Sequence, residues 1–293
     1  MNMQRARFWS AILCTVMAAG TANADEPTFA DVAYDDAHAA QRLDVYLAKT
    51  EKPAPVMIYI HGGAWRAGSK KHVPQWLHTL RREAGIAVVS VEYRFTDVAT
   101  HPAQVNDCLR AVQFVRHRAT AWNIDPTRVG VTGGSAGGHL SAYVALHDDV
   151  ADRQAQDAVA RLSSRVRCAV SFAGPTDWSL LKRKEIAHTH PAYRQLIGYE
   201  PKTPVENMAA DRLRDVSPIS FVSKDDPPVM QVHGSADQIV PVQHAESLHK
   251  RLQSAGVTAE LVVIEGAKHN VAGASEKIAE RPTAFVRKYL ASP

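Results

Sequence analysis

Short, almost wholly apolar runs alternate with longer segments of helical periodicity from residue 54 onward, and this alternation restricts the possible folds more than any other feature. Residues 55–60 (PVMIYI) have no polar face, which is typical of a strand buried on both faces of a parallel sheet. Residues 104–117 instead place their apolar side chains three and four positions apart, as a helix with one buried face does. The sequence therefore predicts an α/β protein with a mainly parallel central sheet flanked by helices. The expected strands are 55–60, 86–91, 128–132, 168–172, 229–232 and 261–264, and the expected helices are 104–117, 139–147, 243–252 and 278–290.

Other parts of the chain depart from this alternation. Residues 32–34 and 43–47 are predicted to pair as an antiparallel hairpin at the edge of the sheet. The charged, alanine-rich residues 148–165 are predicted to form an exposed helical connection. Residues 175–227 contain several prolines, and a loop of that length without structure of its own is unusual in a compact domain. We therefore expect a cap-like insertion, about 175–227, over the carboxyl end of the sheet, within a single domain of residues 25–293.

The amino terminus has the composition of a secretory leader. Two arginines precede an apolar run over residues 8–19, and residues 22–24 (ANA) supply the small residues of a cleavage site. The run is shorter than the roughly 20 apolar residues that a membrane-spanning helix needs. We therefore predict that residues 1–24 are a signal peptide. The mature protein is expected to be soluble, exported to the periplasm or the medium, and not inserted in a membrane.

Composition and charge disfavour several other classes of protein. The chain is 45% hydrophobic and 22% charged, the proportions of an ordinary globular protein. Its net charge of +4 is spread along the chain without a basic stripe, so no nucleic-acid partner is predicted. Cys108 falls in a predicted helix and Cys168 in a predicted strand, which favours two separate buried thiols over the disulfide that export would permit. His188 and His190 have no adjacent carboxylate or cysteine, so we interpret them as solvated loop residues and expect no metal.

The glycine-rich residues 133–138 (GGSAGG) follow a predicted strand and open a predicted helix. In this context a G-x-S-x-G motif holds a serine at a sharp turn, where its hydroxyl is exposed. Gly133 and Gly137 would let the neighbouring backbone approach that turn. The spacing fits neither the dinucleotide-binding nor the P-loop motif. Ser135 is therefore a candidate nucleophile, with a simple glycine-rich turn as the alternative.

Residues 61–65 (HGGAW) come at the end of the predicted strand 55–60. Two glycines after a strand let the backbone N–H groups of the turn point into a common space, where they can stabilise a developing oxyanion. The alternative is an ordinary tight turn in which Trp65 is a surface or core aromatic residue.

Two titratable residues follow predicted strands nearer the carboxyl terminus. Asp237 comes after strand 229–232, and His269 comes after strand 261–264. Open α/β sheets bind their ligands at the carboxyl ends of such strands. The chain order Ser135, Asp237, His269 is the order of a hydrolase triad on this type of sheet. The alternative for Asp237 is that it only caps the helix that follows it.

These residues resemble those of α/β-hydrolases of the esterase/lipase type, in particular the hormone-sensitive-lipase-like group and the BD-FAE group of feruloyl- and acetyl-xylan-esterase-like proteins. The resemblance extends from about residue 43 to the carboxyl terminus. It is carried by HGGAW at 61–65, YR at 93–94, HPAQ at 101–104, NIDP at 123–126, GGSAGG at 133–138, SP at 217–218, HGSAD at 233–237 and His269.

The resemblance implies a serine-esterase mechanism that requires no metal and no organic cofactor. Ser135 would attack the acyl carbon, His269 would move the proton, and Asp237 would orient the imidazole. Many lipase-like members of the group carry a third glycine where this chain has Ala64. The backbone N–H is kept, but the acyl pocket beside Trp65 would be narrower. The implied oxyanion hole consists of the N–H groups of Gly63, Ala64 and Ala136.

Asp177 occupies the position where some hydrolases of this fold carry their acid. The HGSAD turn at 233–237 matches the family pattern directly and favours Asp237 instead. Asp177 and Trp178, together with Trp65, are expected to line the substrate cleft.

The implied activity is that of an exported serine carboxylesterase acting on short-chain or small aromatic esters, either free small molecules or groups linked to a polysaccharide. An arylformamidase-like amide hydrolase is an alternative, because such enzymes also carry the HGGxW pattern. A catalytically inactive binding protein on the same fold is another. A membrane-associated lipase is disfavoured, because residues 175–227 are rich in charge. The oligomeric state is left open by the sequence.

Overall fold

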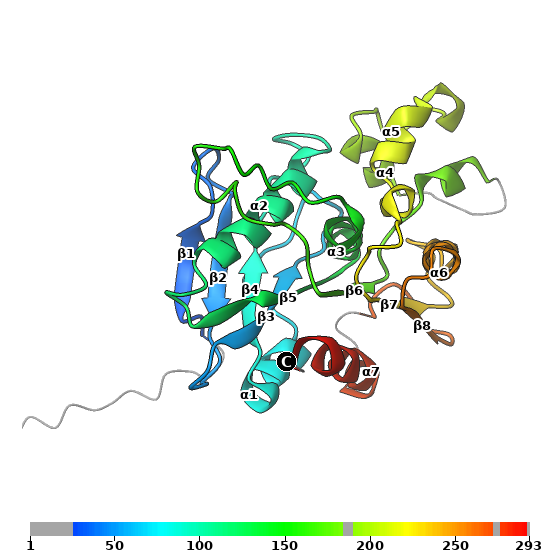
Figure 1. Ribbon diagram of the computed structural model, residues 1–293. Coiled ribbons are helices and arrows are strands. Elements are labelled where there is room, and N and C mark those ends of the chain that lie inside the picture. The colour runs from blue at the N-terminus through cyan, green and yellow to red at the C-terminus, as the bar shows by residue number, and fades with distance from the viewer. Residues whose placement is uncertain (1–25, 184–189, 272–275, 292–293) are drawn as a thin grey trace, which may run out of the picture.

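Figure 1 shows the computed structural model, which describes residues 26–183, 190–271 and 276–291. The predicted signal peptide, residues 1–24, and His188 lie outside the described residues. An eight-stranded sheet runs through the centre in the order β1-β2-β4-β3-β5-β6-β7-β8. The strands from β4 to β8 in this order are parallel, whereas β2 is antiparallel to both β1 and β4, as predicted for the edge hairpin. The strands are β1 (Phe29–Ala33), β2 (Arg42–Tyr46), β3 (Ala54–Ile60), β4 (Ala87–Val91), β5 (Ile124–Gly134), β6 (Cys168–Phe172), β7 (Val229–Gly234) and β8 (Ala259–Ile264).

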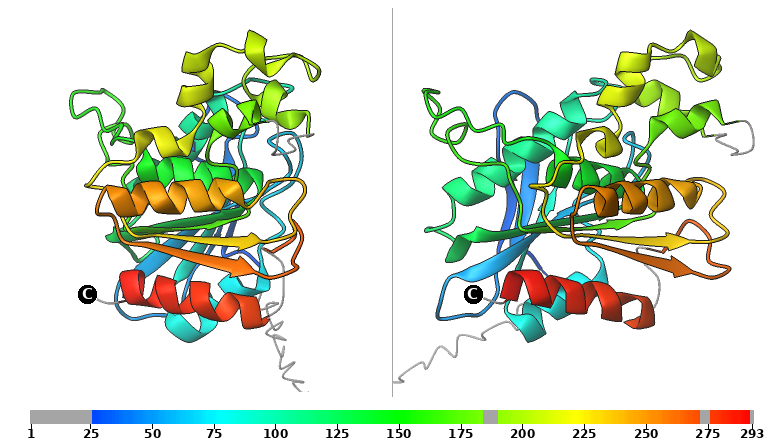
Figure 2. Two further views of the ribbon diagram at one scale, coloured as in Figure 1. Left: turned by 90° about the vertical axis from the view of Figure 1, so that its right-hand side faces the viewer. Right: turned by 45° about the vertical axis from the view of Figure 1, so that its right-hand side comes forward.

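Helices cover both faces of the sheet (Figure 2). The helices α2, α3 and α6 lie on one face, and α1, α7 and the π-helical turn η4 lie on the other. Every residue of α3 is buried, whereas α1 buries one stripe that includes Leu77 and Leu80. This arrangement is the α/β-hydrolase architecture that the sequence predicts. The helices are α1 (Gln75–Ala84), α2 (Ala103–His117), α3 (Ala136–Leu146), α6 (Gln243–Ser254), α7 (Glu276–Val286) and η4 (Arg287–Ala291).

The central strands supply most of the core. All seven residues of β3 are buried, because its neighbours β4 and β5 flank it and helices cover both of its faces. Each valine or isoleucine buried in this way stabilises the fold by roughly 1.5–3 kcal/mol. Cys108 packs in the core on the α2 face and Cys168 in the core on the α1 face, so the sheet separates the two free thiols.

Residues 148–165 form turns, so the predicted helix is wrong, although most of this stretch is at least partly exposed as expected. Asp149, Asp152 and Asp157 each accept a hydrogen bond from the backbone N–H two residues further along, at 2.9–3.2 Å. Such bonds close local turns and compete with the hydrogen bonds of a helix. The aspartates therefore outweigh the helical tendency of the alanines between them.

The long connection between β6 and β7 contains short helices in its described part. In Figure 2 it lies beyond α3 and α6, on their side of the sheet. It is fastened to α3, where the hydroxyl of Tyr143 donates to the carbonyl oxygen of Asp215 at 2.9 Å. None of the helices in the described ranges has the length and apolar character needed to cross a membrane. The helices of this connection are η1 (Trp178–Lys182), α4 (Ala192–Leu196), η2 (Val205–Asn207), α5 (Ala210–Asp215) and η3 (Pro218–Phe221).

Candidate active site

Ser135 lies at the turn that joins the central strand β5 to α3. Its backbone has φ 56° and ψ −119°, a conformation that costs a non-glycine residue roughly 1–3 kcal/mol. The surrounding backbone holds it there, because the N–H of Ser135 donates to the carbonyl oxygen of Phe172 at 2.8 Å. The turn also passes very close to β3: a Cβ on Gly137 would lie 2.0 Å from the carbonyl oxygen of Ile60. Only glycine fits at that position without displacing the backbone.

His269 and Asp237 meet Ser135 at the carboxyl end of the sheet. The imidazole Nε2 of His269 lies 2.8 Å from the Oγ of Ser135, and its Nδ1 lies 2.7 Å from the Oδ2 of Asp237. Because a carboxylate can only accept, Nδ1 carries the proton and Nε2 is free to accept the serine hydroxyl. The arrangement can therefore withdraw a proton from Ser135 and return it.

Asp237 is held in its ionised form by its surroundings. Burial alone would raise the pKa of Asp237, but hydrogen bonds from His233, His269 and the N–H of Val240 outweigh it and hold that pKa well below the usual range. The N–H groups of Ile239 and Val240 donate to Oδ1 at 2.9 and 3.0 Å. The other oxygen, Oδ2, is left to face the two imidazoles.

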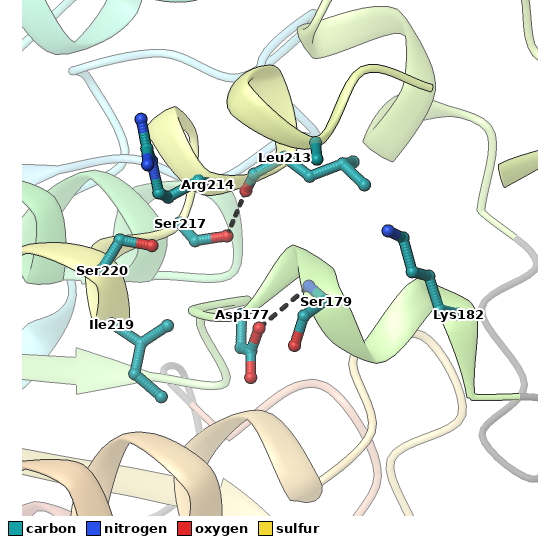
Figure 3. Close-up of a pocket in the computed structure, with 9 residues that line it drawn as sticks. Asp177, Ser179, Lys182, Leu213, Arg214, Ser217, Ile219 and Ser220 are labelled. Carbon is teal, nitrogen blue, oxygen red and sulfur yellow. Dashed lines mark hydrogen bonds between the residues drawn. The ribbon is translucent and has the colours of Figure 1, made fainter. Parts of the chain in front are cut away.

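Asp177, the other acid considered from the sequence, lies in a different environment. Its carboxylate accepts the N–H of Ser179 at 2.9 Å at the start of η1, and its own N–H donates to Nδ1 of His244 at 3.1 Å. Figure 3 shows the carboxylate turned toward Ser179 at the wall of a cavity of about 350 Å³. The contact of Asp237 with His269 has no counterpart at Asp177 in the described part of the chain.

The loop after β3 lies against the Ser135 turn. A Cβ built on Gly62 would be 3.4 Å from the Cβ of Ser135, so the two backbones are nearly in contact. Gly63, Ala64 and Trp65 have φ of 116°, 55° and 56°, a run of left-handed conformations that turns the loop sharply. Within the described residues, the backbone N–H groups of Gly63, Ala64 and Ala136 have no acceptor among the hydrogen bonds of the chain.

The base of this loop is closed by Glu92, which no sequence motif marks. One carboxylate oxygen of Glu92 lies 2.7 Å from Nε2 of His61, and the other accepts the N–H of Lys70 at 3.2 Å. Glu92 thus joins the two ends of the loop. The ammonium group of Lys70 in turn contacts the carboxylate of the buried Asp44 at 2.8 Å, which ties the loop to β2.

The tryptophans expected to contact substrate are inside the protein. Trp65 is 3% exposed and Trp178 is fully buried, with their ring centroids 5.9 Å apart. The indole N–H of Trp65 donates to Nδ1 of His139 at 3.1 Å. Their contact with substrate stays a prediction.

His190, interpreted from the sequence as a solvated loop residue, is half-buried, and its Nδ1 accepts the N–H of Ala192 at 3.3 Å. Burial, followed by the electrostatic influence of Arg66, lowers the pKa of His190. No cluster in the described ranges brings together three or more side chains that could hold a metal ion.

Opposite effects on stability are expected from substitutions at two neighbouring positions of the loop. A Cβ on Gly63 would lie 1.9 Å from the carbonyl oxygen of Ala67, so Gly63→Ala should lower the free energy of unfolding by more than about 2 kcal/mol. Ala64→Gly removes left-handed strain of about 1–2 kcal/mol and adds about 0.4–1 kcal/mol of chain entropy to the unfolded state.

Ala64→Gly should therefore leave stability unchanged or raise it by up to about 1.5 kcal/mol. Urea denaturation of both variants beside the unmodified protein measures this. A Gly63→Ala protein as stable as the parent would contradict the geometry of the loop, as would an Ala64→Gly protein destabilised by more than about 1 kcal/mol.

Comparisons of the sequence with known proteins find similarity to an esterase family and to carboxylic ester hydrolases. The sequence model of the BD-FAE family matches residues 43–252. The probable carboxylic ester hydrolase LipM of Mycobacterium tuberculosis is 32% identical over 76% of this chain and 51% of its own length. The chain spans about half the length of the curated relatives it matches.

Solved structures extend this similarity over more of the chain. A truncated carbohydrate esterase from gut microbiota superposes with a TM-score of 0.76 at 28% identity, covering 92% of this chain and 98% of its own. An acetyl ester-xyloside bifunctional hydrolase from Caldicellulosiruptor lactoaceticus superposes with a TM-score of 0.72 at 27% identity, covering 84% and 87%.

Proposed function

The chain belongs to the BD-FAE family, and on that premise we propose that it is a serine carboxylic ester hydrolase acting on short-chain or small aromatic esters. The observation that carries the proposal is the hydrogen-bonded series from Ser135 through His269 to Asp237. It supplies a nucleophile at a sharp turn, a base within reach of its proton, and a carboxylate that fixes the tautomer of the base.

In the proposed mechanism, Ser135 Oγ attacks the acyl carbon while Nε2 of His269 takes the serine proton. The imidazolium is stabilised by the ionised Asp237, and it then protonates the departing alcohol. Water hydrolyses the acyl-enzyme by the same steps in reverse. The free N–H groups of Gly63, Ala64 and Ala136 would receive the oxyanion, and each such donor typically contributes roughly 3 kcal/mol in the transition state.

Three separate observations support short-chain or small aromatic esters as the substrate class. The connection between β6 and β7 carries many charged side chains, such as Lys182 and Arg214, which is unfavourable for the apolar lid of an enzyme that binds long acyl chains. The relatives described as a carbohydrate esterase and an acetyl ester-xyloside hydrolase support small acyl groups attached to sugars. The leader-like residues 1–24 support export, which would place the enzyme among polymer-linked esters.

The proposal is tested by initial rates on p-nitrophenyl acetate, butyrate, octanoate and palmitate, followed by release of acetate from acetylated xylan. Acetate or butyrate should be hydrolysed at least about tenfold faster than palmitate, because a small pocket discriminates against added methylene groups. A rate of hydrolysis that rises sharply once a long-chain ester forms micelles would show that the protein is a lipase and not an esterase for short acyl chains. No activity on any ester would instead support the amide hydrolase or the inactive binding protein.

A further inference from the structure

His139 lies in the first turn of α3, one helical turn after Ser135, and both of its ring nitrogens are used. The indole N–H of Trp65 donates to Nδ1 at 3.1 Å, and Nε2 lies 2.9 Å from the carbonyl oxygen of Val216. Because the indole can only donate and the carbonyl can only accept, the neutral ring with its proton on Nε2 satisfies both contacts. The side chain is completely buried.

The ring of His139 therefore joins three segments that are far apart in the sequence. Trp65 belongs to the loop after β3, His139 belongs to the helix that begins at Ser135, and Val216 ends α5 in the long connection. Aromatic contacts fix the ring from the sides: its centroid lies 5.2 Å from that of Trp65, at an interplanar angle of 87°, and 4.9 Å from that of Trp178.

The contact bears on the Ser135 site through the backbone of the loop. Ala64 and Trp65 are both left-handed, and such strain persists only where the surroundings determine the conformation. A buried indole N–H also needs an acceptor, because a buried donor without one is left desolvated and unpaired. His139 thus fixes Trp65 and, through it, the N–H of the preceding Ala64 relative to the same helical turn that carries Ser135.

We propose that His139 is a positioning residue of the esterase, which sets the oxyanion-binding loop relative to Ser135 by accepting the indole N–H of Trp65. This inference rests on the proposed function. It also assigns a different role to each ring nitrogen of His139. Nδ1 positions the loop through Trp65, and Nε2 holds the connection between β6 and β7 through Val216. Burial lowers the pKa of His139 to about 3, which keeps the ring neutral at the pH of an ordinary assay.

Two substitutions of His139 by residues with amide side chains test the roles of Nδ1 and Nε2 separately. In His139→Asn the amide oxygen lies near the place of Nδ1 and can still accept from Trp65, whereas in His139→Gln the amide nitrogen lies near the place of Nε2 and keeps only the bond to Val216. The variants are compared on p-nitrophenyl acetate with full kinetics. We expect His139→Gln to lower kcat by about tenfold or more with KM changed less than about threefold, and His139→Asn to keep kcat within about threefold.

Trp65→Phe removes the donor of the hydrogen bond between Trp65 and His139 and leaves the sequence of α3 unchanged. It therefore tests the proposal even if His139→Gln folds poorly. It should lower kcat like His139→Gln, and combining the two should cost little more than either alone. Trp122→Phe is the matched control, because Trp122 is equally buried but packs on Phe29 and Phe114 before the start of β5. Its kcat should stay within about threefold of the unmodified enzyme.

Equal losses of kcat in His139→Asn and His139→Gln, or additive losses in the double variant, would overturn the positioning role, and so would an unchanged kcat in Trp65→Phe. In each of those cases the unmodified protein still hydrolyses the ester, and the proposed function stands. An unmodified protein without ester activity would instead remove the proposed function and this inference with it.

Discussion

Replacing Ser135 by alanine is expected to lower kcat for p-nitrophenyl acetate by about 10⁴- to 10⁶-fold, because the covalent route is lost while the oxyanion-binding groups remain. KM and thermal stability should change little, since the side chain makes its hydrogen bond with His269 and is not part of the core. The backbone bond from Ser135 to Phe172 is retained in the variant.

Ser141→Ala is the matched control for this experiment. Ser141 lies in the same helix, is fully buried, and donates its hydroxyl to the carbonyl oxygen of Gly137 at 2.7 Å. Its loss should leave kcat within about threefold. Residual activity in Ser135→Ala above about one hundredth of the parent would show that another group attacks the ester.

Asp237→Asn is expected to lower kcat by about 10³- to 10⁴-fold while the fold is maintained. The backbone N–H groups of Ile239 and Val240 require an acceptor at Oδ1, so the amide oxygen of asparagine would take that place. The amide NH₂ would then face Nδ1 of His269 and drive the imidazole proton to Nε2, where it opposes Ser135. The base would be present in the wrong tautomer.

The matched control is Asp149→Asn, because Asp149 also accepts backbone N–H groups, those of Ala151 and Ser164, but lies in the turns between α3 and β6. Its kcat should be unchanged within about threefold. A large loss in Asp177→Asn together with a small loss in Asp237→Asn would transfer the role of the acid to Asp177.

The low pKa of Asp237 gives this second prediction a dependence on pH. A group whose pKa is lower in the folded than in the unfolded state stabilises the fold above its unfolded value, and that contribution is lost as the pH falls through the folded value. Asp237 therefore stays ionised in mildly acidic assays, and a fall in rate between pH 8 and pH 5 does not come from its protonation. Below about pH 4, Asp237→Asn should lose less stability on further acidification than the parent does, as urea midpoints would measure.

Most of the sheet was predictable, because buried parallel strands are continuous apolar runs. The prediction for β6 matches the structure at both ends, whereas β5 begins at Ile124 rather than at residue 128. Ile124 pairs with Ala54 of β3, and the next paired residue is Val129, opposite Val56. Asp125 and Pro126, which carry no strand pattern, lie in the register irregularity between these two pairs. No sequence prediction covers the helix α1, although it is amphipathic and buries Leu77, His78 and Leu80 on one side.

The candidate site was predictable only where a motif or a chain order marks it. Ser135, Asp237 and His269 follow strand ends in a recognisable order, and the structure brings these three side chains together. Glu92 and His139 have no such signal. Their partners His61 and Trp65 are 31 and 74 positions away, so the contacts exist only after the sheet has formed.

The Ser135 turn, braced by Phe172 on β6 and by Ile60 on β3, has a consequence for the temperature dependence of the rate. Ser135, the proposed nucleophile, loses its conformational freedom once, when the sheet forms, and needs no further ordering in each turnover. The activation entropy of acylation should therefore reflect the immobilisation of the ester rather than of the serine. The rate of ester hydrolysis should therefore rise smoothly with temperature until the sheet unfolds. At that temperature the geometry of Ser135 and the packing of the core should be lost in the same transition.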